Sequence, residues 1–419
     1  MVLHPGQLSF GSQHPSAPLP PEALMQIVSA RVHLDLEQSS RMEALLRGGL
    51  NWADIMTESR RLGTLPLLYK HLSQPGFSRH VPEEVRTALK EEYRNQAMRN
   101  LRIYGLIERL LSSFEEAHIA VVLLKGAFLA RWVYQDIALR PMGDIDILCR
   151  EEQESLVRTQ LAELGLHHET VYPSLFHERF FAVNKGGHIN PFYGSRPLMV
   201  EVHFSIFPNV PQAFMHMPRV WDRIGLQPAE GMYPSCLAPD DLVLYLCLHL
   251  MQHLRFGQCM LYWFCDICEA IAHYRDQLEW ERLFLTAESL AVVDQVQPIL
   301  RLLSRHWQSR VPEMHGEVEE LSLATILRKQ VLMDHEEKQR AIIRGQFKKL
   351  GMVQEIRGWP NRLYFLWKLV FPSRENLISR YGLRHPVMLT LSCLVHPLVL
   401  AKRAVVSLFH HIFTSYRTR

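Results

Sequence analysis

Two aspartates, Asp144 and Asp146, stand two positions apart in the stretch GDIDILC. On a β-strand this spacing directs both carboxylates to one face, where they repel each other unless a cation lies between them. Mg²⁺ prefers hard oxygen ligands and commonly links carboxylates to the phosphates of a substrate. A third acid, Glu201, lies in the centre of the later run LMVEVHF, where burial of its charge would be costly without such a role. We therefore predict a site for Mg²⁺ or Mn²⁺ at Asp144, Asp146 and Glu201.

Four neighbouring residues suit a phosphate ligand. Gly126 follows an apolar run and opens a helix, so the amides of that helix N-terminus can hold an anion without a β-carbon in the way. Lys125 adds a positive charge at the same place. Arg140 precedes a proline and is held extended, which aims its guanidinium towards the aspartates, and Gly143 lets a ligand approach the backbone. The pattern predicts that these residues bind the phosphates of a nucleotide.

Three further residues are candidates for an accessory role. His203 shares a strand face with Glu201 and either orients that acid, touches the substrate or is structural. His249 and His253 are four apart on an expected helix and either ligate metal or pack inwards. We favour packing, with Asp266 of the following helix accepting a hydrogen bond from His249. That bond would tie the two helices together.

The elements that must position these residues change in type along the chain. Short β-branched and aliphatic runs predict strands at 119–124, 144–149, 177–183 and 198–205. Apolar residues at a spacing of three to four predict helices before and after this part of the chain, including one that starts after Asn51 and one over 83–117. The expected fold class is α+β, with a small mixed-sheet core embraced by mostly helical N- and C-terminal regions.

These patterns divide the chain of 419 residues into five parts. We expect a flexible tail at 1–20, an N-terminal helical region at 21–100, the mixed core at 101–230, a helical domain at 231–339 and a basic, aromatic-rich helical region at 340–419. Apolar residues make up 47% and charged residues 21%, so a sizeable core can form.

The charge is unevenly distributed. The net charge is +3, too small to indicate a dedicated nucleic-acid binder. Residues 340–419, however, hold 14 basic and 2 acidic residues, a balance of +12, which leaves −9 for the rest. Aromatic residues are interleaved with these basic ones, as in WPNRLYFLWKLVFP. This region suits peripheral contact with an anionic membrane or another polyanion such as RNA, or forms a final helical layer with a solvated basic rim.

The cysteines and the longest apolar runs bear on location. Seven cysteines, an odd number, lie mostly inside apolar runs, which favours a reducing compartment and hence the cytoplasm. The first 21 residues lack the pattern of an export signal. The longest apolar run, 386–401, includes a histidine and a proline and is shorter than the ~20 residues that a membrane-spanning helix needs. We expect no transmembrane segment and a cytoplasmic protein, with any membrane contact peripheral.

The motifs together resemble a known superfamily. A strand, a glycine-containing turn and helix, an aspartate-x-aspartate strand and a later single acid are similar to the nucleotidyltransferases with the DNA polymerase β-like fold. More narrowly, KGAFLA, LRPMGDIDIL, the EVH triplet, APDDLVLYLCLHL and WFCDI resemble a bacterial group of uncharacterised nucleotidyltransferases, from Pro66 to about Gly382. The usual Gly-Ser pair after the first strand is replaced by Lys125-Gly126-Ala127, so Lys125 stands in for the serine hydroxyl.

The resemblance implies a nucleotidyltransferase core and transfer of a nucleoside monophosphate from an NTP to an acceptor that the sequence does not identify. Asp144, Asp146 and Glu201 would be catalytic and would hold the metal. The alternative is an inactive protein that keeps the fold to bind a nucleotide or a partner. Replacing both aspartates with asparagine should abolish transfer and, because like charges repel, leave stability unchanged or higher.

Overall fold

The structure is a computed structural model, and it describes most of the chain up to residue 332. The described residues are 19–168, 174–184, 188–189, 191–194, 198–210, 213–226, 235–255, 257–314, 320–332, 356, 358–373, 376–377 and 396. Most of the basic region expected at 340–419, including its end beyond residue 396, therefore lies outside the described residues.

A seven-stranded mixed sheet lies at the centre of the fold, with the strand order β3-β4-β5-β2-β1-β7-β6. In its middle, β2 pairs antiparallel with β1 and parallel with β5. Because β2 and β5 are parallel and adjacent, residues in register on them point their side chains to the same face. The strands are β1 (Val121–Leu123), β2 (Ile145–Cys149), β3 (His167–His168), β4 (Phe192–Tyr193), β5 (Met199–His203), β6 (Gly225–Leu226) and β7 (Ser235–Cys236).

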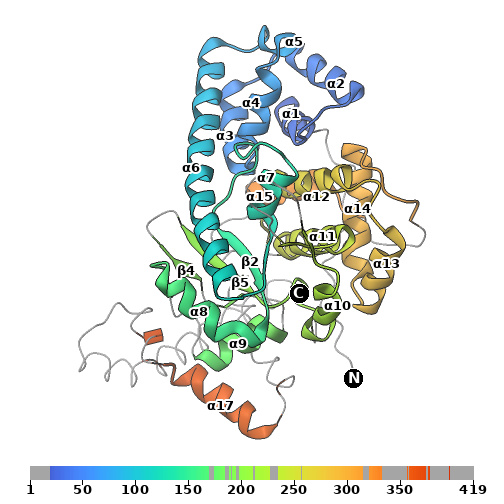
Figure 1. The fold of residues 1–419 in the computed structure, drawn as a ribbon. Coiled ribbons are helices and arrows are strands. Elements are labelled where there is room, and N and C mark those ends of the chain that lie inside the picture. Colours follow the sequence, from blue (N-terminus) through green and yellow to red (C-terminus); the bar gives the residue numbers. More distant parts are fainter. Residues whose placement is uncertain are drawn as a thin grey trace.

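Six helices precede the sheet and stand together at the top of Figure 1. They are α1 (Pro21–Ser29), α2 (Leu36–Arg47), α3 (Trp52–Leu62), α4 (Leu65–Leu72), α5 (Pro75–Ser78) and α6 (Glu83–Glu116). The Asn51 side chain accepts hydrogen bonds from the amides of Ala53 and Asp54, as its position before α3 predicts. The long helix α6 extends from this group down to the sheet (Figure 1). The domain boundary expected at residue 100 falls inside α6, so that division stays a prediction.

Short helices connect the strands of the sheet. They are α7 (Lys125–Trp132), the 3₁₀ helix η1 (Glu151–Gln153), α8 (Glu154–Glu163), α9 (Leu175–Asn184), the 3₁₀ helix η2 (Ala213–His216) and α10 (Met217–Trp221). The prediction of a strand at 177–183 is wrong, because this segment lies within helix α9. Its rings recur at helical spacing: Phe176 and Phe180 pack on Phe365 of the distant helix α17 (Trp359–Val370). Because Phe365 is distant in the chain, the sequence around α9 does not show that these rings are buried by another helix.

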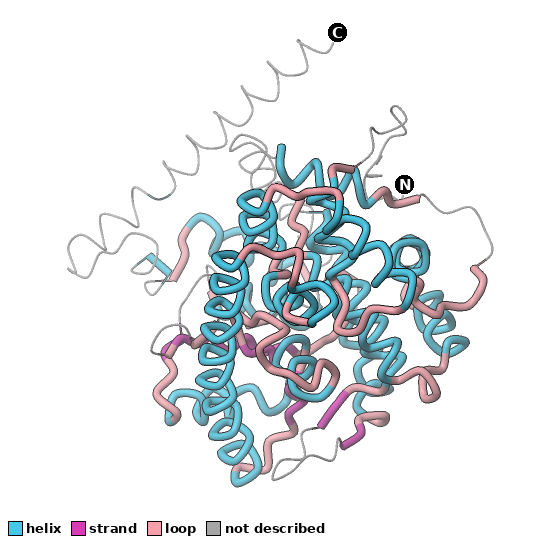
Figure 2. Tube along the Cα trace, turned by 90° about the horizontal axis from the view of Figure 1, so that it is seen from above, coloured by secondary structure: helices cyan, strands magenta, loops and turns pink. Residues whose placement is uncertain are grey.

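The remaining helices follow the sheet in the chain, and the first four of them lie together towards the right of Figure 1. They are α11 (Pro239–Arg255), α12 (Leu261–His273), α13 (Trp280–Ser289), α14 (Val293–Trp307), α15 (Leu323–Leu332) and α17. One continuous core of buried apolar side chains links the sheet with α6, α7, α11, α12 and α14. Figure 2 shows helices forming most of the described chain, with the strands gathered in one part of it. The α+β class predicted from the sequence is confirmed.

Two further expectations meet the structure here. Within the described part of the chain, no helix combines the length and the apolar character needed to cross a bilayer. The six cysteines that the structure describes are all buried, and no disulfide forms among them. The Cys268 sulfur also accepts a hydrogen bond from Ser309 Oγ at 3.1 Å.

Candidate active site

The adjacent strands β2 and β5 bring two of the predicted acids together. Asp146 on β2 and Glu201 on β5 are partners in the parallel register. Asp144 directly precedes β2 and shares the face of Asp146, since strand side chains alternate. Asp146 is buried, whereas Asp144 and Glu201 are half-buried. Asp146 and Glu201 therefore lie side by side on adjacent strands, and Asp144 is close enough for its charge to act on Glu201.

Lys125 supplies a positive charge inside this cluster. Its Nζ lies 2.6 Å from Asp146 Oδ1, and the two side chains are only 11% and 3% exposed. Burial alone would lower the pKa of Lys125, but the negative charge of Asp146 more than offsets it and the pKa is raised. Burial alone would raise the pKa of Asp146, but Lys125 and His203 hold it well below its usual range. Both groups are thus charged in the folded protein.

The other two acids hold their protons more tightly than ordinary carboxyl groups do. The pKa of Asp144 is raised to about 6, chiefly by the charge of Asp146 and then by burial. Burial, followed by the charge of Asp146, raises the pKa of Glu201 to about 8. Both shifts have the physical cause expected when several carboxylates share one site with too little positive charge.

The donor set at this place fits a hard divalent cation. Ligand atoms of Asp146, Glu201 and His203 all lie within 4.8 Å of one another. His203 Nε2 is 3.0 Å from Asp146 Oδ1 and 3.9 Å from Glu201 Oε2, so it orients the first acid. Burial lowers the pKa of His203 to about 4, so the ring is neutral at pH 7. Two carboxyl groups and one neutral imidazole offer oxygen and nitrogen ligands for a divalent ion, and a bound cation would favour the ionised form of Glu201.

Lys125 is also the first residue of α7. Its φ of +41° lies in the left-handed region, where a side chain is strained. The strand β1 ends next to β2, since the Leu124 amide donates to the Asp146 carbonyl at 3.0 Å, and the chain must turn into α7 at once. The turn places the helix N-terminus, with the amides of Lys125 and Gly126, beside the carboxylates.

Arg140 has a different set of partners from the one expected. Its Nη2 donates to Asp266 Oδ2 at 2.8 Å and its Nε to Asp266 Oδ1 at 3.2 Å, in a pair that is almost wholly buried. The guanidinium also lies over the ring of Tyr262, 4.6 Å from its centre. It packs on Gly126, where an added β-carbon would come within 2.3 Å of Arg140 Nη1. Arg140 therefore joins the core to α12, and Gly126 makes room for it.

The two accessory histidine and aspartate candidates are not joined to each other. Asp266 accepts hydrogen bonds from Arg140 and from Tyr134 Oη, the latter at 2.7 Å. His249 instead makes ring contacts, with His253 at 4.4 Å and Trp263 at 5.8 Å between centroids. The link between α11 and α12 thus differs from the hydrogen bond expected from the sequence. Gly143 is exposed, and a β-carbon there would meet open space.

Comparison with known families now decides the relationship. Residues 48–308, more than half of the chain, match the family described as uncharacterised nucleotidyltransferase. The chain belongs to this family. No curated protein matches it. Among solved structures, the solution structure of the antibiotic-resistance factor ANT(2'')-Ia is similar with a TM-score of 0.32 and 10% identity, covering 50% of this chain and 100% of that one. Similarity at this level says nothing about chemistry.

Two residues of this nucleotidyltransferase lie at the site without having been predicted. His188 Nε2 is 3.6 Å from Glu201 Oε1. Tyr245, on α11, is buried, and its hydroxyl lies close to Lys125 without a hydrogen bond of regular geometry. Tyr245 could have been predicted from the sequence, because it stands four residues before His249 and therefore shares its helix face. His188 could not have been predicted in this way, because only its pairing with β5 brings it to Glu201.

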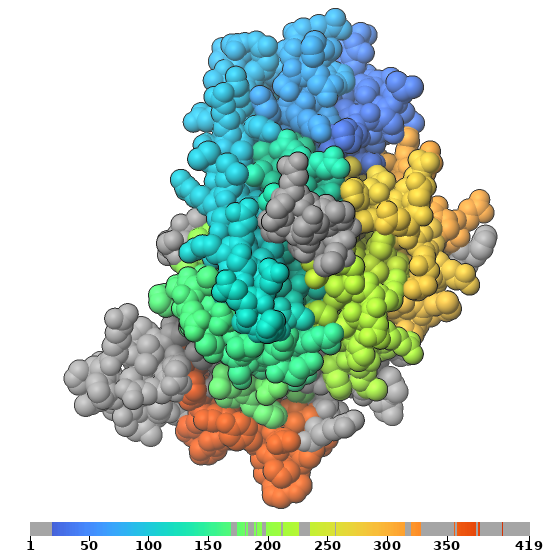
Figure 3. Space-filling model, viewed as in Figure 1, coloured from blue at the N-terminus to red at the C-terminus, as the bar shows by residue number. Residues whose placement is uncertain are grey.

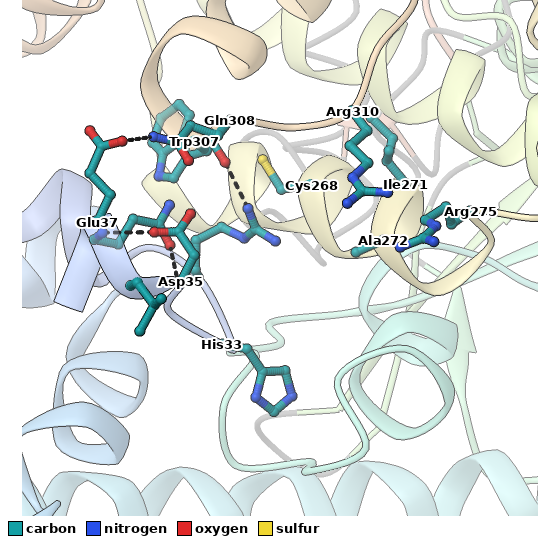
Figure 4. Close-up of a pocket in the computed structure, with 13 residues that line it drawn as sticks. His33, Asp35, Glu37, Cys268, Ile271, Ala272, Arg275, Trp307, Gln308 and Arg310 are labelled. Atoms are coloured by element: carbon teal, nitrogen blue, oxygen red, sulfur yellow. Dashed lines mark hydrogen bonds between the residues drawn. The ribbon is translucent and has the colours of Figure 1, made fainter.

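A cavity of about 570 Å³ lies elsewhere in the nucleotidyltransferase, between the segment before α2 and the helices α12 and α14. Figure 4 shows the residues that line it, and none of the carboxylates of the candidate site is among them. Its polar groups largely satisfy one another: Arg31 pairs with Glu269 and the Trp307 carbonyl, and Gln308 donates to Glu37. We assign these contacts to the joint between the N-terminal helices and the rest of the fold.

Proposed function

We propose that this protein is a metal-dependent nucleotidyltransferase that moves a nucleoside monophosphate from an NTP to an acceptor still to be identified. The observation that carries the proposal is the register of Asp146 and Glu201 on adjacent parallel strands, with Asp144 on the same face. Membership of the family supports the reaction class. Three acids gathered at one place, two of them with raised pKa values, support a cationic cofactor that also binds a phosphorylated substrate.

The residues near α7 would hold the triphosphate. Lys125 provides a buried positive charge, and the amides that begin α7 point out of its N-terminus, where an anion is favoured. Arg140 uses its hydrogen bonds on Asp266 and Pro141, but its charge still acts on Asp144 and favours a negative group there. The open space at Gly143 leaves room for the ligand.

In the proposed reaction, the oxygen of an acceptor hydroxyl forms a bond to the α-phosphorus of the NTP. The bond from that phosphorus to the oxygen bridging the α- and β-phosphates breaks, and pyrophosphate leaves with the electron pair. The raised pKa of Glu201, about 8, makes its ionised carboxylate a stronger base than an ordinary glutamate, and this ionised form takes the hydroxyl proton on a carboxylate oxygen. His203 and His188 keep the neighbouring carboxylates oriented.

Asp144, Asp146 and Glu201 are the residues that would hold Mg²⁺ or Mn²⁺. When bound, such an ion neutralises charge on the triphosphate and orients the α-phosphate. Lys125 would then exchange its contact with Asp146 for one with phosphate oxygens, which keeps its charge balanced throughout.

Label transfer tests the proposal directly. The full chain is incubated with each α-labelled NTP, Mg²⁺ or Mn²⁺, and an extract that supplies acceptors. We expect a labelled product with the wild type and with Asp222→Asn, a control at an exposed aspartate of the surface. Asp144→Asn with Asp146→Asn should give none. Binding of NTP without transfer in every extract would favour the alternative, a nucleotide-binding protein without activity.

We also propose that the C-terminal part of the chain attaches this cytoplasmic enzyme to an anionic membrane surface. The supporting observation is the outer face of α17, whose large apolar side chains at helical spacing are exposed: Trp359 (72%), Leu363 (56%), Trp367 (58%) and Val370 (37%). On the opposite face, Phe365 is fully buried against Phe176, Phe180 and Ile356. Figure 3 shows α17 at the outer edge of the molecule, at the bottom of the view.

A lipid surface suits both features of this region. Tryptophan is favoured at the boundary between headgroups and acyl chains, and the balance of +12 over residues 340–419 attracts anionic headgroups. The contact should be peripheral, through one helix face and basic side chains, and should weaken with salt.

Vesicle flotation tests this attachment. The full chain should float with phosphatidylserine-containing vesicles at low salt, float less at high salt and not float with neutral phosphatidylcholine vesicles. Trp359→Ser with Trp367→Ser should abolish flotation, whereas Leu285→Ser, at an equally exposed leucine of α13, should not. Equal failure to float with both vesicle types at low salt, or salt-dependent binding to RNA alone, would overturn the lipid proposal.

A further inference from the structure

Three rings form a row along one face of α11. Tyr245, His249 and His253 follow each other at intervals of four residues, so their side chains lie one above another on the helix. Their ring centroids are 6.2 Å apart for the first pair and 4.4 Å apart for the second. With a rise of about 1.5 Å per residue, the row spans about 12 Å. This length is comparable with that of a nucleoside monophosphate.

The neighbouring helix extends the row. Trp263 of α12 stacks on His253, with centroids 4.3 Å apart and an angle of 30° between the planes. Its ring also meets His249 edge-on at 5.8 Å and 78°. We call Tyr245, His249, His253 and Trp263 the aromatic row. Two helices thus contribute to one continuous aromatic surface.

One end of the row lies at the carboxylates. Lys125, Asp146 and Glu201 all act on the pKa of Tyr245, which burial raises above its usual value. The Tyr245 hydroxyl is buried close to the Lys125 ammonium and makes no hydrogen bond of regular geometry. Adjacent to a candidate phosphate site, a ligand oxygen is the partner that would satisfy it.

The other end of the row is accessible and uncharged. His249, His253 and Trp263 are half-buried, so each keeps part of its surface in contact with solvent. Burial, with a contribution from the charge of Lys125, lowers the pKa of both histidines, and their rings are therefore neutral at pH 7. His253 is held in place by Gln258, whose Oε1 is 2.7 Å from its Nδ1.

We propose that the aromatic row is the nucleobase subsite: His249, His253 and Trp263 stack the base of the NTP whose phosphates lie at Lys125 and Asp146, and the Tyr245 hydroxyl donates to an oxygen of that nucleotide. This inference rests on the proposed function. Stacking on an aromatic surface tolerates every base, because each base has a π-face. We therefore expect the enzyme to bind all common NTPs through this surface.

Binding measurements without an acceptor test the row separately from catalysis. Tryptophan fluorescence and calorimetry are recorded for the full chain with Mg²⁺ and ATP, GTP, CTP or UTP, and with inorganic tripolyphosphate, which has no base. The wild type should show quenching by the NTPs but not by tripolyphosphate. Trp263→Phe should lose the quenching, and Trp280→Phe, a matched control on α13, should retain it.

Replacing one ring of the aromatic row with leucine measures how much that ring contributes to NTP affinity. Trp263→Leu should weaken NTP binding about tenfold, the effect of losing one stacked base, and leave tripolyphosphate binding unchanged. His253→Leu removes the ring that supports Trp263 and should weaken NTP binding in the same sense. A thermal melt of His253→Leu shows whether this variant is folded. If Trp263→Leu does not fold, His253→Leu still tests the aromatic row.

The outcomes separate the two proposals. Unchanged NTP affinity in Trp263→Leu and His253→Leu, with tripolyphosphate still bound, would overturn the aromatic row and leave the proposed function standing. Failure of the wild type to bind either NTP or tripolyphosphate would overturn both. Quenching of Trp263 by an unphosphorylated oligoribonucleotide but not by NTPs would overturn the assignment to the NTP base, because the stacked ring would then belong to an acceptor.

Discussion

Lys125 Nζ and Asp146 Oδ1 are 2.6 Å apart in a place where both side chains are almost fully withdrawn from solvent. Each charge depends on the other, because an unpaired buried charge is strongly destabilising. Lys125 also holds this position with a left-handed backbone, at φ +41°. The pair keeps Asp146 ionised in the absence of a cation. It also places a lysine where phosphate would arrive.

The first prediction concerns the coupling between these two residues. Lys125→Met alone, or Asp146→Asn alone, should lower the free energy of unfolding by about 3–5 kcal/mol, because each leaves a buried charge without its partner. The double variant should recover part of this loss. Urea denaturation of the wild type and the three variants measures the coupling energy.

The same double-mutant cycle on the exposed pair Arg60 and Glu92 provides the reference. Its coupling energy should be below about 1 kcal/mol. If the buried pair showed no more coupling than this surface pair, the proposed dependence of each charge on the other would be wrong.

The second prediction separates the two aspartates. Asp144→Asn should raise the melting temperature of the metal-free protein, because it removes a charge that Asp146 repels. Asp146→Asn should lower it, because Lys125 loses its counter-charge. This differs from the expectation drawn from spacing alone, that replacing both would leave stability unchanged or higher. Both variants should lose label transfer.

Calorimetric melts with and without Mg²⁺ and NTP provide a second readout of the same two variants. The wild type should gain stability from the ligand, and both variants should gain little. Full retention of the ligand-induced shift in Asp146→Asn would place the site elsewhere.

The third prediction concerns Gly126. An added β-carbon would come within 2.3 Å of Arg140 Nη1 and 2.8 Å of Met142 Cγ, so Gly126→Ala should displace the guanidinium from Asp266. We expect a loss of about 2–4 kcal/mol of unfolding free energy, as for a disturbed buried ion pair. Gly105→Ala is the control, since a β-carbon there meets nothing and alanine should stabilise helix α6 by about 0.5–1 kcal/mol. Equal effects at both glycines would contradict the contact with Arg140.

The fourth prediction is a pH dependence far from the site. His71 of α4 is 1% exposed, and its Nε2 lies 2.7 Å from the Arg31 carbonyl. Burial, with smaller effects from Lys70 and His33, lowers its pKa from 6.5 to about 4. Between these values the folded protein binds fewer protons than the unfolded chain. Stability should therefore fall as the pH falls from about 6.5 to 4, by about 3 kcal/mol from this group.

Urea denaturation over pH 4–7.5 measures this slope. His71→Gln, which keeps a donor for the carbonyl, should flatten it, and His167→Gln, at an exposed histidine, should not. A slope that is the same in His71→Gln and wild type would show that other groups cause the acid sensitivity.

Much of the site and the fold followed from short stretches of sequence. The alternation of side chains on a strand was enough to place Asp144 and Asp146 on one face, and a single acid in an apolar run identified Glu201. Capping residues and apolar spacing located helices such as α3 and α6 to within a few residues. The segment 177–183 was assigned the wrong element, because its rings are buried by α17 rather than by a sheet.

The partners of the charged residues did not follow from such stretches. Arg140 is 126 residues from Asp266, and the arginine was expected at phosphate because the proline after it holds it extended towards the aspartates. His188 and Tyr245 likewise reach the carboxylates only through strand pairing and helix packing. A local pattern specifies which face of its own helix or strand a residue occupies. Which residue lies opposite depends on how distant elements pack, and a buried charge is stable only where that packing supplies its counter-charge.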